Sequence, residues 1–401
     1  MAEVFVGPSR LQGRVVPPPS KSIAHRVLIG AALSGLPQQE VERWGLGGEL
    51  GQDLEATKAC LRALLTAGPE PVILDCRDSA STLRFLLPVA AALGRSALFV
   101  GSSGLARRPL REYGEILGGR GVRLSFQGPA SLPVRVEGRL RGGVFQVPGD
   151  VSSQYITGLL LALPLLVEDS TVILTSPLQS APYVELTKSV LAEFGIAVED
   201  IPGAGWRVPG RQVYRRPAVP PFVEADYSQA AFWLVAKFLG HYLEVDGLLP
   251  RSLQGDRAIV PILAEMAAAP LGDLRISAAQ IPDLVPILAV AACARPGITI
   301  ITEAERLRLK ESDRLLTTTE MLSRLGARIS PDQGALIIHG GRQLRGGTVD
   351  SHADHRIAMA AAIAALDSAA GVRILGSEAV AKSYPGFFQE LKRLGGDARG
   401  I

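Results

Sequence analysis

The sequence predicts an α/β fold of two similar domains with mixed sheets. Its 401 residues repeat one order of parts six times. In each repeat a polar or charged cluster opens an apolar, helix-like run, a short strand-like segment follows, and a more amphipathic helix then ends near a glycine. This alternation of strands and helices is typical of α/β architectures. Each repeat is one supersecondary unit, which must pack against its copies to bury its apolar face.

The starts of the apolar helices bear most directly on function. The first N–H groups of a helix lack intrahelical partners and carry a partial positive charge, so several starts that converge form a site for anions. The six starts are Ser20-Lys21-Ser22, Ser79-Ala80-Ser81, Ser152-Ser153-Gln154, Tyr227-Ser228-Gln229, Asp283 and Asp354-His355-Arg356.

Two stretches divide the chain. Residues 17–19 are three prolines, a rigid and extended point just before the first cluster. Residues 203–222 are rich in Pro, Gly and Arg and break the periodicity. A crossing at both places gives one domain over 16–224 and a second that joins 1–15 to 225–401, with three repeats in each. A single continuous solenoid is the alternative, but it leaves apolar helices partly exposed at its ends.

Composition excludes several classes of protein. The net charge is +3, aromatics make up 5%, and no Lys/Arg block is present, which argues against nucleic-acid and membrane-surface partners. The N-terminus lacks a secretory signal and the apolar windows meet Pro or charge before about 18 residues, so we expect a cytoplasmic protein without a membrane span. Cys60, Cys76 and Cys293 lack CxxC spacing and are expected to be buried thiols. Without Walker, GxGxxG or HExxH motifs, we expect no nucleotide or metal chemistry.

The first polar cluster suits an anion. Ser20 is a good N-cap, and Ser22 and Arg26 lie four apart on one helix face. With Lys21 they combine a cap, a point charge and a guanidinium fork, which fit a phosphate or carboxylate. A capped helix with exposed basic residues remains the alternative.

The segment LRLKESDR, residues 307–314, is denser in charge. Lys310, Glu311, Asp313 and Arg314 place four charges within five residues at a helix start. Such a cluster can hold a carboxylate beside two cations, as acid–base chemistry on an anionic substrate requires. A solvated first turn with weak local salt bridges is the alternative.

Two further starts combine a carboxylate with a cation. Asp354 can cap an apolar helix on which Arg356 is awkward unless it reaches an anion, and His355 is interpreted as a packed or capping histidine. Asp283 places a carboxylate at the mouth of a buried helix, with a plain N-cap as the alternative. Together the boundaries indicate a site for a substrate with several negative charges. Its carboxylates are Asp283 and Glu311, and its cations are Lys21, Arg26, Arg84, Arg108, Arg314, Arg356 and Lys382.

The motifs occur in the order seen in one family. PSKSIAHR, LRFLLP, RRPL, VSSQYITGLLLA, SAPYVELT, QGDRA, IPDLVPILAV, LKESDRL, ADHRIAMA and AKSYPGFF follow one another along the chain. Essentially the whole chain resembles the 5-enolpyruvylshikimate-3-phosphate synthases, and LKESDR with DHRIAMA is highly specific. The resemblance implies the enolpyruvyl transferase fold. In that fold, two domains of three βαβαββ units each form an inside-out α/β barrel, and an interdomain cleft closes over the substrates. We expect a monomer.

The resemblance also implies a reaction and the residues that perform it. The enolpyruvyl group of phosphoenolpyruvate is transferred to the 5-hydroxyl of shikimate 3-phosphate by addition and elimination, with release of phosphate and without a cofactor. Asp283, helped by Lys310, accepts the hydroxyl proton, and Glu311 exchanges a proton with the methylene carbon. The implied shikimate 3-phosphate contacts are Lys21, Ser22, Arg26, Ser152, Ser153, Gln154, Ser180, Asp283 and Lys310. The implied phosphoenolpyruvate contacts are Lys21, Ala80, Arg108, Gln154, Arg314, Arg356 and Lys382, the last also catalytic.

This chain departs from the family pattern in two motifs. The family commonly has Asn and Gly in the motif that here begins Asp78-Ser79-Ala80, and Asn where Arg306 precedes LKESDR. Whether Asp78 and Arg306 contact a ligand therefore stays open. The methyl group of Ala80 is expected to narrow the phosphoenolpyruvate pocket and to weaken binding of glyphosate, a bulkier mimic.

Two other functions compete with this one. UDP-N-acetylglucosamine enolpyruvyl transferases resemble the chain in fold but use a Cys on a loop near the RRPL position, and residues 104–110 contain none. A non-catalytic, anion-binding relative of the fold is the second alternative. Simple binding does not require Asp283, Glu311 and Lys382 together, which favours the enzyme.

Overall fold

The computed structural model describes residues 2–41, 44, 46, 50–66, 68, 71–269 and 271–400. The chain forms two compact units, one of Pro19–Val223 and one that joins the residues up to Pro18 to those from Glu224 onward. These limits lie three residues and one residue from the predicted positions 16 and 224. Each unit has its own apolar core. We refer to them as the Pro19–Val223 unit and the Glu224 unit.

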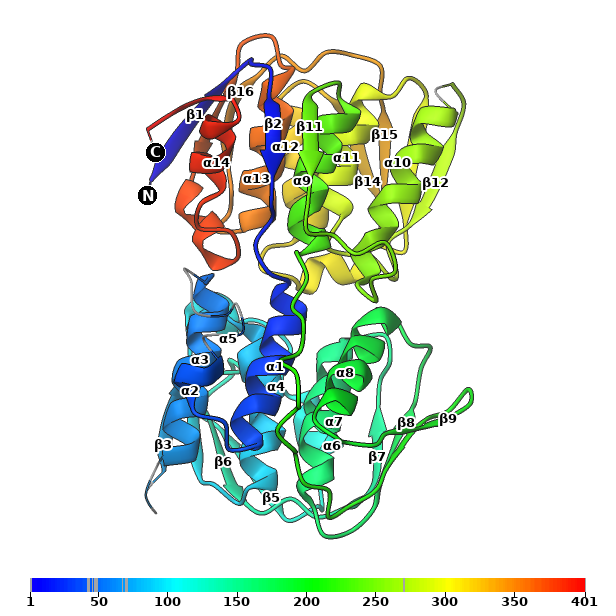
Figure 1. Cartoon of the computed structure of the whole chain (residues 1–401). Helices are drawn as coiled ribbons and strands as arrows, with labels where there is room; N and C mark the ends of the chain where they lie inside the picture. Colours follow the sequence, from blue (N-terminus) through cyan, green and yellow to red (C-terminus); the bar gives the residue numbers. More distant parts are fainter. Residues whose placement is uncertain are drawn as a thin grey trace. The chain divides into compact units, whose positions relative to one another are not determined.

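The helices that follow the polar clusters are buried on nearly all sides. Every residue of α13 (His355–Leu366) is buried, and in α4 (Ala80–Ala92) all but Ser81. A helix that is apolar all round needs cover on every face. Accordingly α4 packs on α7 (Ser153–Ala162), and α13 packs on α11 (Val285–Ala294). In Figure 1 the strands of each unit lie outside these helices.

Each unit contains two four-stranded sheets that share one topology. The strand orders are β3–β4–β6–β5 and β7–β8–β10–β9 in the Pro19–Val223 unit, and β12–β13–β15–β14 and β16–β17–β1–β18 in the Glu224 unit. In each sheet the first two strands are parallel and the other neighbours antiparallel. A parallel pair needs a crossover, which α4, α7, α11 and α13 provide. Four of the six predicted repeats thus have the βαβαββ order, with β1 from the N-terminus completing the last.

The two other repeats are simpler. Their strands β2 (Gln12–Val15) and β11 (Tyr242–Val245) form a two-stranded parallel sheet in the Glu224 unit. Their helices include α1 (Lys21–Leu33) and α3 (Gln52–Thr66) in one unit, and α9 (Tyr227–Phe238) and α10 (Ile259–Ala268) in the other.

The remaining elements have the following bounds. The strands are β1 (Glu3–Gly7), β3 (Val72–Asp75), β4 (Ala97–Val100), β5 (Val122–Phe126), β6 (Val134–Gly138), β7 (Gly143–Val147), β8 (Ser170–Leu174), β9 (Glu199–Ile201), β10 (Gly205–Val208), β12 (Leu274–Ser277), β13 (Ile298–Thr302), β14 (Arg328–Asp332), β15 (Ala335–His339), β16 (Gly347–Asp350), β17 (Val372–Leu375) and β18 (Asp397–Arg399). The helices are α2 (Gln38–Val41), α5 (Ser103–Ala106), α6 (Glu112–Ile116), α8 (Ala181–Glu193), α12 (Arg314–Arg324) and α14 (Phe387–Arg393), with the 3₁₀ turns η2 (Leu163–Leu165), η3 (Gly255–Ala258), η4 (Glu305–Leu309) and η5 (Ser377–Lys382).

The cysteines and the lengths of the apolar helices bear on two predictions from the sequence. Cys60, Cys76 and Cys293 are buried free thiols, as predicted. Within the ranges that the structure describes, no helix is both long enough and apolar enough to cross a bilayer.

Candidate active site

Asp283 faces three cations in the Glu224 unit. Its Oδ1 accepts hydrogen bonds from Arg314 Nη1 at 2.7 Å and from Lys310 Nζ at 3.3 Å. Its Oδ2 accepts from Arg356 Nη2 at 3.1 Å. The N-cap position of α11 belongs to Leu284, so the interpretation of Asp283 as a plain N-cap is wrong. The carboxylate instead gathers cations from the segment before α12 and from α12 and α13.

Arg314 lies at the centre of this group and is fully buried. Its Nε donates to Asp354 Oδ2 at 2.8 Å and its Nη2 to Glu311 Oε2 at 2.6 Å. Asp354 caps α13 by accepting from the backbone N–H of Arg356 at 2.9 Å. The side chain of Glu311 is only 19% exposed and that of Arg314 1%, so the interpretation as a solvated first turn is wrong for these two residues. It holds for Asp313, which pairs with Arg308 while both side chains are partly exposed. We name Asp283, Lys310, Glu311, Arg314, Asp354 and Arg356 the charged cluster.

Burial and neighbouring charges set the ionisation of the cluster. Burial lowers the pKa of Lys310 to about 8, against the attraction of Asp283, while Arg314 adds to the lowering. Burial also opposes the charge of Arg314, but Asp354 and Glu311 more than compensate and raise its pKa. Arg314 therefore stays charged, whereas Lys310 loses its proton more readily than an exposed lysine.

This difference predicts a pH profile. If the ammonium of Lys310 is needed to hold Asp283 and an anionic ligand, kcat/KM falls about tenfold per pH unit above about 8, because the amine then loses its charge. In Lys310→Arg the guanidinium keeps its charge, and the fall moves up by at least one pH unit. Lys188→Arg, at a lysine of the other unit that pairs with Glu185 and Asp200, should leave the profile unchanged. A profile for Lys310→Arg that matches the unaltered chain contradicts this role.

Sequence reasoning assigned no role to Asp256, in η3. This residue is 3% exposed, and its Oδ2 accepts from the hydroxyl of Ser228, near the start of α9. Burial and the charge of Asp283 together raise the pKa of Asp256 to about 7, against the lowering effect of Arg356. Ser228 and Asp283 lie 28 and 27 positions away in the sequence, so only the motif QGDRA marks Asp256 locally.

Lys382 and His355, which the sequence singled out, both lie at the start of α13. Lys382 Nζ donates to the carbonyl oxygen of Ala353 at 2.9 Å, directly before the cap residue Asp354. His355 is 1% exposed, which confirms the interpretation as a packed histidine.

The Pro19–Val223 unit carries a second group of predicted residues. Lys21 Nζ pairs with Asp53 Oδ2 at 2.7 Å, and neither side chain is more than 18% exposed. Ser20 occupies the N-cap position of α1, but its side chain accepts no capping hydrogen bond, contrary to prediction. Asp53, near the start of α3, was also missed by sequence reasoning, because it lies 32 positions from Lys21.

Arg26 is buried rather than exposed on α1, so the alternative of a helix with exposed basic residues is wrong for it. Its Nε donates to Thr187 and its Nη2 to Thr157 and to the carbonyl oxygen of Tyr183. Its Nη1 donates to the carbonyl oxygen of Ser22. Four of its five N–H donors thus bind acceptors within the protein.

The VSSQ motif forms the start of α7. Ser152 is the N-cap and accepts from the backbone N–H of Gln154 at 3.3 Å. Ser153 is 5% exposed. The side-chain amide of Gln154 donates through Nε2 to Ser81 at 3.0 Å. This contact brings together the starts of α7 and α4.

The other predicted residues lie at the ends of elements. Ser180 precedes α8 in a left-handed conformation, with φ of 57°. Ala80 is the first residue of α4 and is 4% exposed. The carbonyl oxygen of Arg108 accepts from Ser131 at 2.8 Å. Asp78 accepts a hydrogen bond from Ser102, and Arg306 lies in η4.

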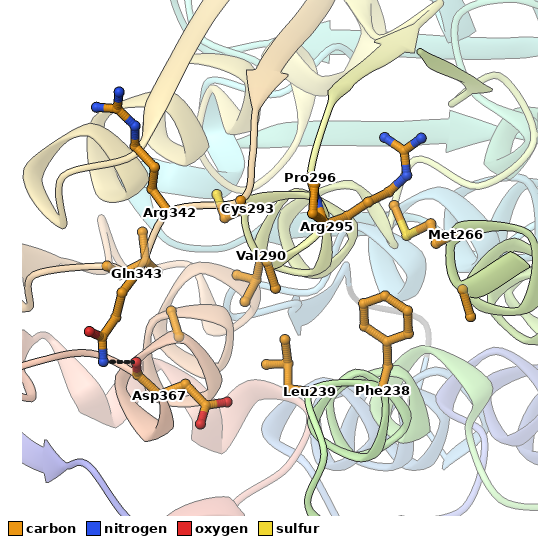
Figure 2. Close-up of a pocket in the computed structure, with 15 residues that line it drawn as sticks. Phe238, Leu239, Met266, Val290, Cys293, Arg295, Pro296, Arg342, Gln343 and Asp367 are labelled. Atoms are coloured by element: carbon orange, nitrogen blue, oxygen red, sulfur yellow. Dashed lines mark hydrogen bonds between the residues drawn. The ribbon is translucent and has the colours of Figure 1, made fainter. Parts of the chain in front are cut away.

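A cavity of about 480 Å³ lies in the Glu224 unit at the C-terminal ends of its helices, whereas the charged cluster lies at helix starts (Figure 2). It is lined by the C-terminal ends of α9, α11 and α13 and by residues 341–344, and its walls include Phe238 and Val290. The guanidinium of Arg295 donates to the carbonyl oxygens of Ala269, Gly272 and Ile298, so it is already engaged by the protein. None of the residues predicted for the active site lines this cavity.

Comparisons with known proteins identify relatives along the whole chain. The family EPSP synthase (3-phosphoshikimate 1-carboxyvinyltransferase) matches residues 6–391. The 3-phosphoshikimate 1-carboxyvinyltransferase of Clostridium kluyveri is 39% identical, with 99% of this chain and 98% of the relative covered. That of Clostridium acetobutylicum is 39% identical, with 98% and 97% covered.

Solved structures share the fold. EPSP synthase from Acinetobacter baumannii superposes with a TM-score of 0.76 at 22% identity, covering 99% of this chain and 100% of that one. The enolpyruvyl transferase NikO from Streptomyces tendae gives a TM-score of 0.72 at 19% identity, covering 99% and 98%.

Proposed function

The chain belongs to the EPSP synthase family, and we propose that it transfers the enolpyruvyl group of phosphoenolpyruvate to the 5-hydroxyl of shikimate 3-phosphate through the residues described above. The products are 5-enolpyruvylshikimate 3-phosphate and phosphate. We also propose that the chain acts as a cytoplasmic monomer.

The observation that carries the proposal is the environment of Asp283. A carboxylate that could serve as base lies within 3.3 Å of nitrogen atoms from three cations, at helix starts that favour anions. An anionic substrate can take over contacts with these cations and so leave Asp283 beside its hydroxyl. The cations then stabilise the charge that develops in the transition state.

The proposed reaction needs four proton transfers and no external electrons. Asp283, assisted by Lys310, takes the proton of the 5-hydroxyl as the oxygen bonds to C2 of phosphoenolpyruvate. Glu311 gives a proton to the methylene carbon, which becomes a methyl group. The product of this addition is an intermediate that is tetrahedral at C2. Glu311 then removes a proton from the resulting methyl group, the C2–O bond to phosphate breaks, and the double bond returns. The proton held by Asp283 passes to the departing phosphate, which restores the carboxylate.

The remaining predicted residues are proposed to bind the two substrates. We propose that shikimate 3-phosphate contacts the starts of α1 and α7 and the residue before α8, through Lys21, Ser22, Arg26, Ser152, Ser153, Gln154 and Ser180. We propose that phosphoenolpyruvate contacts Lys21, Ala80, Arg108, Gln154, Arg314, Arg356 and Lys382. Both ligands are polyanions, which fits guanidinium and ammonium groups beside capping turns.

Phosphate release measured with both substrates tests the proposed reaction. Release that requires phosphoenolpyruvate and shikimate 3-phosphate together is the expected result. Release with UDP-N-acetylglucosamine in place of shikimate 3-phosphate would support the rival transferase, and binding without release would support the non-catalytic alternative.

Ala80 is proposed to limit glyphosate binding. Its methyl group lies at the buried start of α4, where Ser79 caps the helix by accepting from Thr82 N–H at 3.2 Å. Ala80→Gly should lower the inhibition constant for glyphosate at least tenfold, because the pocket gains the volume of a methyl group. Ala90→Gly removes a methyl from the same helix away from its start and should not change it. A sub-micromolar inhibition constant for the unaltered chain, competitive with phosphoenolpyruvate, would refute the role of Ala80.

A further inference from the structure

Arg84 donates a hydrogen bond to the side chain of Gln154. We propose that Arg84 is a positioning residue: by donating to Gln154 Oε1, it turns the amide so that Nε2 presents an N–H to the anionic substrates. This inference rests on the proposed function, in which Gln154 contacts both ligands.

The hydrogen bonds of the amide allow one orientation. Arg84 Nη1 donates to Gln154 Oε1 at 2.8 Å, and Gln154 Nε2 donates to Ser81 Oγ at 3.0 Å. A guanidinium only donates, so an amide turned by 180° would place its NH₂ group against other N–H groups. Nε2 carries two N–H groups and Ser81 takes one. The second is the group that can reach a substrate oxygen.

Arg84 is itself held firmly. It is 3% exposed, and its Nη2 donates to the carbonyl oxygen of Pro109. Its guanidinium lies over the ring of Tyr155, 5.1 Å from the centroid. Tyr113 donates to its backbone carbonyl oxygen at 2.6 Å. One side chain therefore connects the start of α7 with the segment that follows Arg108.

A purely structural role makes a different prediction. If Arg84 only filled space and satisfied the carbonyl oxygen of Pro109, its loss would lower stability but would act independently of Gln154. A positioning role requires that the effect of Arg84 disappear when Gln154 is absent.

A double-mutant cycle separates the two roles. With shikimate 3-phosphate saturating, Arg84→Met should lower kcat/KM for phosphoenolpyruvate by about 10–100-fold. Gln154→Leu should cause a loss of similar size, and the double variant should be within threefold of Gln154→Leu alone. Losses that multiply would overturn the proposal, as would a loss below threefold for Arg84→Met.

Three further variants separate the positioning role from a general loss of folding. Arg84→Lys keeps a donor for Oε1 and should retain kcat/KM within tenfold. Gln154→Glu keeps an acceptor for Arg84 but offers no N–H, so it should lose as much as Gln154→Leu. Arg295→Met removes another buried guanidinium, 3% exposed at the end of α11, and should lower stability without changing kcat/KM.

A spectroscopic readout makes the test independent of turnover. The side-chain N–H signals of Gln154, assigned by their loss in Gln154→Leu, should exchange slowly with solvent in the unaltered chain and quickly in Arg84→Met. Unchanged exchange in Arg84→Met overturns the positioning role. Absence of phosphate release from the unaltered chain instead counts against the proposed function and leaves this readout intact.

Discussion

Replacement of Asp283 by alanine is expected to lower kcat by about 10²–10⁴-fold, the usual contribution of a positioned base. The dissociation constant for shikimate 3-phosphate should change by less than tenfold. Asp283 has a carboxylate that accepts hydrogen bonds from Arg314, Lys310 and Arg356, and these three cations remain to bind an anion when it is removed. Initial rates of phosphate release give kcat, and calorimetry gives the dissociation constant.

The matched control removes a different carboxylate from the same region. Asp313 caps α12 beside Arg314 and pairs with Arg308 near the surface. Asp313→Ser deletes this charge but keeps an oxygen that can cap the helix, so kcat should stay within threefold. If Asp283→Ala loses kcat and shikimate 3-phosphate affinity to the same extent, Asp283 is a ligand and not the base.

Local patterns in the sequence predicted the elements that position the site. The apolar runs after VSSQ and ADHR became the buried helices α7 and α13, and the segments ALFV and ITII became β4 and β13. These helices and strands can be predicted because helix periodicity, capping residues and strand length are properties of neighbouring residues. The cap role of Asp354 was predicted for the same reason.

Long-range partners could not be predicted from the same patterns. Lys21 pairs with Asp53 across 32 positions, and Arg84 bonds to Gln154 across 70. Nothing local to these residues distinguishes them from other charged or amide side chains on helices. Only the packing of α1 with α3, and of α4 with α7, places them in contact.

The alternatives for Asp283 and Arg26 show what burial adds. The sequence allowed a capping role for Asp283 and an exposed position for Arg26. Arg26 is 2% exposed and the side chain of Asp283 is 20% exposed, so each charge has lost much of its water and needs partners within the protein. Asp283 finds three cations, and Arg26 finds four acceptors.

Arg314→Met should be the most destabilising single change in the charged cluster. Arg314 is fully buried and pairs with Asp354, Asp283 and Glu311 at 2.6–2.8 Å. Methionine removes the charge that these carboxylates share and leaves the fully buried Asp354 beside the partly buried Asp283 and Glu311. Breaking a buried ion pair from one side costs about 3–5 kcal/mol, and the free energy of unfolding of the Glu224 unit should fall by that amount.

Urea unfolding followed by the fluorescence of Trp233, which is buried in this unit, measures the loss. Arg308→Met breaks an ion pair whose side chains are 50% and 31% exposed, and it should change stability by less than about 1 kcal/mol. In Arg314→Met the folded cluster should take up protons more readily than the unfolded chain, because closely spaced buried carboxylates resist ionisation. Its deficit should therefore be smaller at pH 5 than at pH 8. A deficit that does not depend on pH would mean that lost packing, and not the loss of the positive charge beside the three carboxylates, causes the destabilisation.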